Sequence, residues 1–451
     1  MNDTIVAIST ALGIGAISII RVSGDDAIKK VNSIFIGKNL EKVASHTINY
    51  GHISENEKII DEVLISVMHA PKTFTRENIV EINCHGGIAT TNKILEMLLN
   101  IGCRLAEPGE FAKRAFLNGR IDLIEAEGIM DLINSKTEQS RELAINQVGG
   151  KVSNLIKTLR QKILEVIANI EVNIDYPEYE DIEELTIKDL EKKMKNIKKQ
   201  ITKILEESEN GKIIKEGIKT VIIGKPNVGK SSILNKLIDE DKAIVTDIPG
   251  TTRDIVEGTL NIGGLLLNII DTAGIRKTED VVESIGVKKS LELTDKSDLV
   301  LYVLNNNEEI TKEDLEIISK LKYKNHIIII NKIDLDKKIE EKYLTDSNIV
   351  YMSTKDNLGF EELKNCIKEM YNLEKIITQD LTYLTNARSI SILKNIVKII
   401  EDIEKGIVNS EYIDMLEIDL KNIWQQLGEI IGETYEDELI EQLFKQFCLG
   451  K

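Results

Sequence analysis

The chain has 451 residues, of which 42% are hydrophobic and 29% charged, a composition typical of a soluble protein with about two to four domains. Its formal net charge of −17 repels nucleic acid, so an RNA contact needs a local basic patch or a partner that supplies one. The four cysteines form no CxxC pair, and the apolar stretch 11–20 is too short and too rich in glycine to span a membrane. We therefore expect a cytoplasmic protein without a membrane anchor.

Residues 1–118 carry short strand-like runs between helical segments, at 4–8, 16–21, 62–68 and 79–83. This pattern predicts a small α+β domain. From about residue 121 to 207 apolar residues recur at spacings of three and four, which is the helical period. Because Pro177 interrupts this run, we predict a long antiparallel pair of helices.

From about residue 215 to 371 strands alternate with helices. The expected strands are 220–223, 255–262, 265–271, 298–304, 326–330 and 349–352, and Gly263-Gly264 predicts a two-residue hairpin between the second and third. This alternation indicates a mostly parallel, doubly wound sheet. The chain after residue 374 is helical again, so we predict an α+β domain (1–118), an α-helical domain (119–214 with 375–451) and an inserted α/β Ras-like P-loop G domain (215–374).

The segment from Gly224 to Ser231 reads GKPNVGKS and fits the G-x-x-x-x-G-K-[ST] phosphate-binding loop. Its glycines let backbone N–H groups curl around phosphates, and the following helix N-terminus adds positive potential. Lys230 should reach the β- and γ-phosphates, and the Ser231 hydroxyl should bind Mg²⁺. The alternative is a simple glycine turn, which the flanking apolar strand and amphipathic helix disfavour.

Two further motifs follow in the order typical of GTPases. Asp271 to Gly274 reads DTAG at the end of a strand, which places Asp271 near the metal and the Gly274 N–H near the γ-phosphate. Asn331 to Asp334 reads NKID, and the Asp334 carboxylate can accept both N–H donors on the edge of guanine. Adenine has no such donor pair and would leave the carboxylate unpaired, so the sequence predicts GTP specificity.

A last pair of segments completes the nucleotide site. Residues 353–355 close the base pocket, and residues 251–252 lie where a switch loop would bring a second hydroxyl to Mg²⁺. The expected GTP-binding residues are Asn227, Val228, Gly229, Lys230, Ser231, Ser232, Thr246, Asp247, Ile248, Pro249, Gly250, Thr251, Thr252, Asp271, Thr272, Ala273, Gly274, Asn331, Lys332, Asp334, Ser353, Thr354 and Lys355.

Two positions distinguish this site from that of Ras. Ile275 follows the DTAG motif, where Ras-type enzymes carry a glutamine that orients water, so another group must take that role. Asn227 offers an amide oxygen that could hold a monovalent cation beside the phosphates and replace an arginine finger. Asn227 could equally be an ordinary Pro-Asn turn residue.

With these residues in view, the chain resembles the tRNA-modification GTPase MnmE (TrmE) family over nearly its whole length. Besides the phosphate-binding loop, the resemblance rests on the segments IRVSG (20–24), EINCHGG (81–87), AEPGEF (106–111), FLNGRID (116–122), GTTRD (250–254), LGEI (427–430) and FCLGK (447–451).

The resemblance implies an N-terminal domain that binds a tetrahydrofolate derivative (the 5-formyl or 5,10-methylene form) and forms a homodimer. It also implies K⁺-stimulated GTP hydrolysis. With the FAD-containing partner MnmG, in a heterotetramer, the family attaches aminomethyl or carboxymethylaminomethyl groups to C5 of the wobble uridine of certain tRNAs. FAD would be held by the partner only, and tRNA would be bound through the complex.

By motif position, the resemblance assigns K⁺ to Asn227, Thr246 and the carbonyls of Ile248 and Thr251, and Mg²⁺ to Ser231 and Thr252. Glu283 would position the attacking water. The catalytic residues would be Glu283 and Lys230 at the nucleotide site and Cys448 near the folate. Folate contacts would fall on Arg21, Glu81, Arg120 and Lys451. Taken without the resemblance, Arg21 and Glu81 are strand-end charges and Glu283 is an exposed acid at a helix start.

Cys448 has the spacing of a prenylation box, being fourth from the end. However, Gly450 is not aliphatic and the acidic stretch 429–441 offers no basic membrane signal. A thiol near the folate is the favoured interpretation. Two other functions stay open: a ribosome-assembly GTPase, and a dimeric nucleotide switch without catalytic coupling to tRNA.

Overall fold

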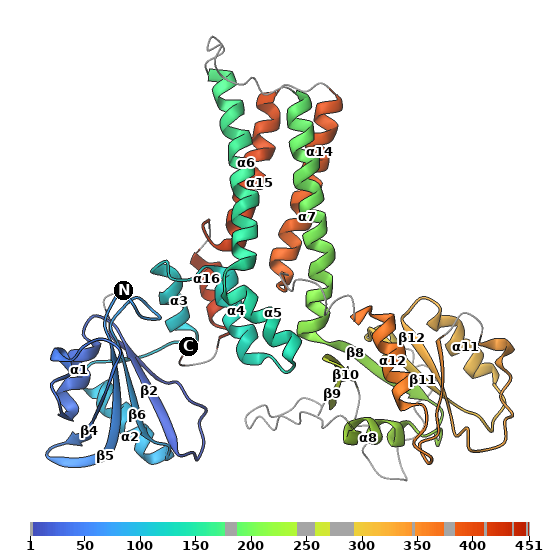
Figure 1. Cartoon of the computed structure of the whole chain (residues 1–451), viewed down its shortest axis with the longest axis horizontal. Coiled ribbons are helices and arrows are strands. Elements are labelled where there is room, and N and C mark those ends of the chain that lie inside the picture. The colour runs from blue at the N-terminus through green and yellow to red at the C-terminus, as the bar shows by residue number, and fades with distance from the viewer. Residues whose placement is uncertain are drawn as a thin grey trace. The chain divides into compact units, whose positions relative to one another are not determined.

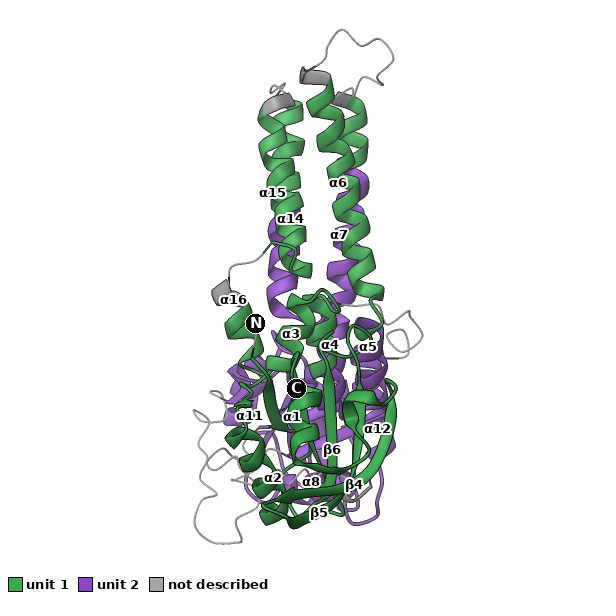
Figure 2. Cartoon of the chain, turned by 90° about the vertical axis from the view of Figure 1, so that its left-hand side faces the viewer, with its two compact units in different colours: residues 1–130, 148–194, 398–451 green, residues 131–147, 195–397 purple. Residues whose placement is uncertain are grey.

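The structure is a computed structural model of the whole chain. It describes residues 3–175, 187–240, 258–270, 293–344, 348–373, 384–409, 413–434, 437–447 and 450. The chain divides into two compact units (Figure 2): unit 1 contains residues 1–130, 148–194 and 398–451, and unit 2 contains residues 131–147 and 195–397.

The N-terminal part of unit 1 is a seven-stranded sheet with the order β3-β4-β5-β6-β2-β1-β7 (Figure 1). Neighbouring strands are antiparallel, except for the parallel pair β1–β7. The strands are β1 (Ile5–Ile8), β2 (Ile17–Ser23), β3 (Phe35–Gly37), β4 (Thr47–Glu55), β5 (Lys58–Met68), β6 (Ile79–His85) and β7 (Arg104–Leu105).

Helices α1 (Ala27–Ile34) and α2 (Ile88–Asn100) cover one face of this sheet, and a short 3-10 helix, η1 (Leu40–Lys42), packs beside them. On β5, Val63, Ile65 and Val67 are buried in this core while Leu64 is exposed. This alternation with a period of two is what a sheet with one covered face requires.

Strand β4 was not predicted from the sequence, although it is one of the longest in the sheet. Two of its inward positions are Asn49 and Gly51, so its apolar alternation is broken. Gly51 is required there because a Cβ would lie 2.4 Å from the Phe35 ring of the neighbouring strand. The strand is therefore formed by its pairing with β5, with little hydrophobic signal of its own.

The helices of unit 1 join the N-terminal sheet to the end of the chain. Phe116 packs with Phe444 and Phe447 in one cluster. At Gly109 a Cβ would lie 2.3 Å from the Phe444 carbonyl oxygen, so this close approach needs glycine. The helices are α3 (Glu110–Leu117), α4 (Leu123–Asn134), whose last turn belongs to unit 2, α6 (Lys151–Asp175), α15 (Ile413–Ile431) and α16 (Asp437–Phe444).

The main packing partner of α6 is α15, from the other end of the chain, rather than the next long helix in sequence (Figure 1). The Arg160 guanidinium lies 3.8 Å from the centre of the Trp424 ring, and Lys421 forms a 2.9 Å ion pair with Glu171. Both predicted long helices, α6 and α7 (Ile187–Glu216), are present, and α6 packs most closely on the C-terminal flank of the chain. Within the described residues, no helix has the length and apolar character needed to cross a membrane.

Unit 2 contains the predicted doubly wound sheet, with the order β13-β12-β11-β8-β10-β9. All neighbours are parallel except β9 and β10, which form the predicted hairpin through Gly263 and Gly264, both at positive φ. The strands are β8 (Ile218–Gly224), β9 (Gly258–Ile262), β10 (Leu265–Ile269), β11 (Leu299–Asn305), β12 (His326–Asn331) and β13 (Asn348–Tyr351).

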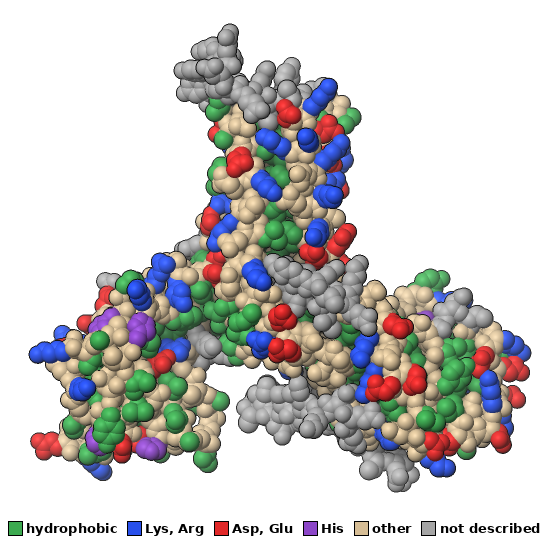
Figure 3. Space-filling view, in the orientation of Figure 1, with side chains coloured by type: hydrophobic (Ala, Val, Ile, Leu, Met, Phe, Trp, Pro, Cys, Tyr) green, Lys and Arg blue, Asp and Glu red, His purple; other side chains and the backbone are tan. Residues whose placement is uncertain are grey.

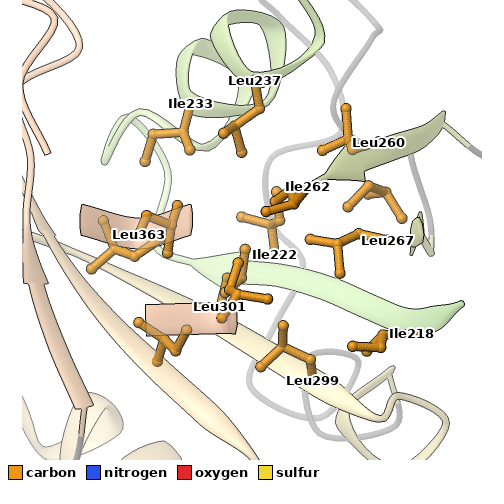
Figure 4. Close-up of a cluster of buried hydrophobic side chains, with 14 of the residues drawn as sticks. Ile218, Ile222, Ile233, Leu237, Leu260, Ile262, Leu267, Leu299, Leu301 and Leu363 are labelled. Atoms are coloured by element: carbon orange, nitrogen blue, oxygen red, sulfur yellow. The ribbon is translucent and has the colours of Figure 1, made fainter. Parts of the chain in front are cut away.

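Helices cover both faces of this sheet, and each face has its own buried cluster. Figure 4 shows one of them, in which Ile222 and Leu301 of the central strands face Ile233 of α8 and Leu363 of α12. The helices are α8 (Lys230–Glu240), α11 (Lys312–Leu321) and α12 (Phe360–Met370), with a 3-10 helix, η2 (Glu341–Tyr343). Two long helices, α7 (Ile187–Glu216) and α14 (Ala387–Val408), contribute to both units.

Helix α5 (Glu138–Val148) belongs to the core of the α/β sheet, although it precedes that sheet by a long stretch of chain. Its Leu143 is 2% exposed and lies in the same buried cluster as Ile218 and Leu267. Its Gln139 packs on the hairpin turn, where a Cβ on Gly264 would lie 2.3 Å from the Gln139 Oε1. This contact is not predictable from the sequence, because the helical period shows only that one face is apolar.

We therefore expect Leu143→Ala to lower the free energy of unfolding by about 2–5 kcal/mol, the usual cost of truncating a buried leucine. The matched control is Ile145→Ala, two residues away on the same helix and 43% exposed, which should change stability by less than about 0.5 kcal/mol. Denaturant unfolding of both variants measures the difference. Equal effects would contradict the placement of α5 in this core.

Candidate functional site

The phosphate-binding loop connects β8 to α8 in the way its sequence predicts. Gly224, Asn227 and Gly229 have φ values of 150°, 62° and 101°. Such turns direct successive backbone N–H groups to one side and form a concave anion site at the start of a helix. Val228 is 1% exposed and fixes the middle of the loop in the core.

Lys230, at the first turn of α8, lies inside the loop. Its Nζ donates hydrogen bonds to the carbonyl oxygens of Gly224 (3.0 Å) and Lys225 (2.6 Å). The ammonium group is therefore held against the loop backbone, at the place where phosphates would bind. Ser231 and Ser232 follow it in the same helical turn.

Asn331, at the end of β12, is fully buried and ties the base-binding segment to the loop. Its Nδ2 donates to the Val228 carbonyl oxygen at 2.8 Å. Gly229 leaves the space for this amide, because a Cβ there would lie 2.2 Å from Asn331 Nδ2. Within the described residues, Asn331 Oδ1 is buried without a hydrogen-bond partner, which leaves an acceptor at the site.

The other base-pocket residues lie around the same loop. Lys332, at φ 64°, donates from Nζ to the Asn227 carbonyl oxygen at 2.6 Å. Asp334 is exposed, and its Oδ1 accepts a hydrogen bond from the Ser353 hydroxyl at 3.0 Å. Thr354 and Lys355 continue the turn after Ser353. The structure thus brings together the phosphate-binding loop, the NKID segment and residues 353–355, and it leaves the Asp334 carboxylate accessible to a ligand.

Several predicted site residues lie outside the described part of the chain. These are Thr246, Asp247, Ile248, Pro249, Gly250, Thr251, Thr252, Asp271, Thr272, Ala273, Gly274 and Glu283 of the G domain, and Cys448 and Lys451 of the tail. Their predicted roles stay predictions.

A second cluster of predicted residues lies on the N-terminal sheet. Arg21 of β2 and Glu81 of β6 are paired across the strands, with 2.7 Å between Arg21 Nη2 and Glu81 Oε1. Arg21 Nη1 also lies 3.4 Å from the carbonyl oxygen of Gly450, which accepts a 3.2 Å hydrogen bond from the Ser9 hydroxyl. The end of the chain therefore reaches this ion pair.

Arg120 is not part of that ion pair. It is exposed in the turn between α3 and α4, where its backbone N–H donates to the Ala115 carbonyl oxygen at 2.8 Å. Its charge acts on Glu125, whose pKa is nevertheless raised because burial opposes ionisation.

An ion pair that was not predicted from the sequence lies next to the phosphate-binding loop, between Lys225 and Asp314 (2.6 Å). The Thr-x-x-Asp spacing of Thr311 and Asp314 is a recognisable helix-start signal, and the structure has this capping box. Nothing in the sequence shows that a lysine from another element also binds this carboxylate.

The sheet order, the loop and the base-pocket segments define a P-loop G domain set within a helical chain. Family models describe the rest: the GTP-binding protein TrmE N-terminus matches residues 4–120, and the MnmE helical domain matches residues 123–448. The chain belongs to the MnmE family of tRNA modification GTPases, which confirms the resemblance seen in the sequence.

Individual relatives agree with this assignment. The tRNA modification GTPases MnmE of Bacillus cytotoxicus, Bacillus mycoides and Bacillus cereus are each 54% identical over 455 aligned residues, which cover 100% of this chain and 99% of each relative. Among solved structures, the G domain of the T. maritima iron transporter FeoB matches with 27% identity, over 34% of this chain and 98% of that domain, with a TM-score of 0.26.

We expect Gly229→Ala to displace the Asn331 amide from the Val228 carbonyl and to strain a backbone at positive φ. The combined cost should be about 2–3 kcal/mol of unfolding free energy. The matched control is Gly87→Ala, at φ −90°, where a Cβ would meet only Thr90 Oγ1 at 3.7 Å. Denaturant unfolding without nucleotide compares the two. A loss for Gly229→Ala no larger than for the control would contradict this packing.

Proposed function

We propose that the chain is a K⁺-stimulated GTP hydrolase that acts with the FAD-containing protein MnmG on C5 of the wobble uridine of certain tRNAs. The group attached would be of the aminomethyl or carboxymethylaminomethyl type, with a tetrahydrofolate derivative as one-carbon donor. One observation carries the GTPase part: Lys230 of the phosphate-binding loop, the Asn331–Asp334 segment and Ser353 come from three separate segments, and hydrogen bonds link the second segment to the loop and to Ser353. The tRNA part rests on membership of the family.

For the nucleotide, the loop N–H groups and Lys230 would hold the β- and γ-phosphates, and Asp334 would accept the two N–H donors of guanine. Ser231, at the N-terminus of α8, is suited to bind Mg²⁺, which would neutralise phosphate charge there. Thr252 would add a second hydroxyl, and Glu283 would position the attacking water.

For K⁺, the support in the described residues is Asn227. It is exposed at the rim of the loop, and its backbone is fixed at φ 62° by the bond from Lys332 to its carbonyl oxygen. An amide oxygen held beside the phosphates is a suitable ligand for a monovalent cation, which would supply positive charge during hydrolysis. Thr246, Ile248 and Thr251 would provide the other ligands.

For folate, the support is the cluster of Arg21, Glu81 and Gly450. The side chains of Arg21 and Glu81 are 21% and 23% exposed, so both reach solvent. A guanidinium suits the carboxylate of a folate tail, and a carboxylate can accept N–H groups of a pterin. Because Gly450 lies at this pair, Cys448 and Lys451 are at most two residues away along the chain.

For the homodimer, the support is an exposed apolar area on the N-terminal sheet (Figure 3). Ile48, Tyr50 and Leu64 are 69%, 60% and 47% exposed, and Tyr50 pairs with Leu64 across β4 and β5. Leu64 also pairs with Asn83 of β6, so these residues share the face on which Glu81 lies. Association through this face would cover apolar side chains that a monomer exposes.

The proposed function is tested by mass spectrometry of wobble nucleosides from cells that carry variants of this chain. Deleting residues 448–451 should abolish the modification while GTP hydrolysis in K⁺ stays nearly intact. Lys230→Ala should abolish hydrolysis, while binding of reduced folate stays measurable by calorimetry. A deletion that destroys hydrolysis and leaves the modification normal would contradict the assignment of two separate sites.

The role of K⁺ gives a further prediction. GTP hydrolysis should be at least about tenfold faster in KCl than in NaCl at equal ionic strength, because a cation at Asn227 neutralises transition-state charge. Asn227→Ala should lose this difference. The matched control, Asn372→Ala, changes another exposed asparagine at positive φ, and should keep it. Equal rates in the two salts would remove the cation from the mechanism.

A further inference from the structure

The side chain of Lys225, the second residue of the phosphate-binding loop, binds the first turn of α11 and not the nucleotide site. Its Nζ lies 2.6 Å from Asp314 Oδ2 and 2.7 Å from Thr311 Oγ1. The Asp314 side chain is 2% exposed and that of Lys225 is 28% exposed. A buried carboxylate thus holds one end of the loop through an ion pair.

Both oxygens of the Asp314 carboxylate accept hydrogen bonds. Its Oδ1 accepts from the Tyr302 hydroxyl at 2.7 Å, and its Oδ2 accepts from the Thr311 backbone N–H at 2.8 Å. Burial disfavours the charged form, but the hydrogen bonds from Lys225, Thr311 and Tyr302 outweigh it and keep the pKa of Asp314 below its usual value. The carboxylate is therefore ionised at neutral pH, and its geometry is fixed by three elements.

Lys225, whose side chain is held by Asp314, also accepts a hydrogen bond from Lys230 through its backbone carbonyl. Lys230 Nζ donates to the Lys225 carbonyl oxygen at 2.6 Å. The position of that carbonyl depends on the path of the loop from Gly224 to Asn227. The ion pair with Asp314 fixes this path from outside the site, because within the described residues the Lys225 side chain donates its hydrogen bonds to Asp314 and to the capping residue Thr311.

We propose that Lys225 and Asp314 are positioning residues for GTP hydrolysis, which hold the first arm of the phosphate-binding loop so that Lys230 is directed at the β- and γ-phosphates. Neither residue touches the nucleotide in this proposal. Their effect reaches the reaction through the backbone of Lys225 and the ammonium group of Lys230. Tyr302 contributes to the stability of the cluster only, because it binds the other carboxylate oxygen, Oδ1.

The first test compares steady-state GTP hydrolysis by Lys225→Met, Lys225→Arg and two controls in the full-length protein. Lys225→Met should lower kcat/KM by about tenfold, the scale of a lost charge-assisted hydrogen bond, and Lys225→Arg should restore most of it. Tyr302→Phe should lower the melting temperature and leave kcat/KM within about twofold of the parent. Lys312→Met, which removes an exposed lysine from the same turn of α11, should change neither.

The second test separates positioning from general stability. In a Lys230→Ala background, Lys225→Met should weaken equilibrium binding of GDP by less than twofold, which is about the uncertainty of such a double-mutant comparison. The effect should be this small because it passes through the side chain of Lys230. In the parent background the same change should weaken GDP binding by about tenfold. Additive effects, or an unchanged kcat/KM in Lys225→Met, would overturn the proposal. So would a loss in Tyr302→Phe equal to that in Lys225→Met.

Discussion

The α/β domain is inserted within helices, so the chain must leave and re-enter the helical part at one place. Asp131, at the end of α4, contacts the chain both where it leaves the helical part and where it returns. Its carboxylate forms a 2.8 Å ion pair with Lys215, just before the sheet begins, and accepts a 3.0 Å hydrogen bond from Thr385, just before α14 begins. Gln147 of α5 donates to the same threonine at 2.9 Å. This network brings together the ends of a long closed loop, whose closure costs entropy that local contacts must offset.

The connection from α7 to the nucleotide site is a single glycine followed by one buried strand. Gly217, at φ 75°, lies between the end of α7 and the start of β8, and a Cβ there would lie 2.6 Å from the Leu266 carbonyl oxygen. Asn268 of β10 donates to the Glu216 carbonyl oxygen at 2.7 Å, which ties the last residue of α7 to the strand that leads toward Asp271. Strand β8 is packed on both faces, and a closely packed core deforms little. A displacement at Gly224 is therefore transmitted along β8 to α7.

The sequence predicted what depends on local chemistry. The phosphate-binding loop, the hairpin at Gly263 and the strand-helix alternation each follow from residue type and spacing, and the structure has all three. It could not predict contacts that depend on tertiary packing. Strand β4 carries Gly51 where Phe35 needs space, Leu143 looks like any apolar helix position, and Lys225 looks like a solvated lysine. In each case the partner belongs to another element, and no local pattern encodes it.

The two candidate sites share no residue, and they differ in how they are assembled. The nucleotide site is built at the ends of strands β8, β12 and β13 of one sheet, so its geometry depends mainly on that sheet. The Arg21–Glu81 cluster also needs Gly450, whose position depends on the packing of Phe444 and Phe447 against α3. The segment that ends at Gly450 follows α15, which packs along α6. A change in the helical flanks therefore alters the N-terminal site by moving its tail, while Arg21 and Glu81 remain fixed on neighbouring strands.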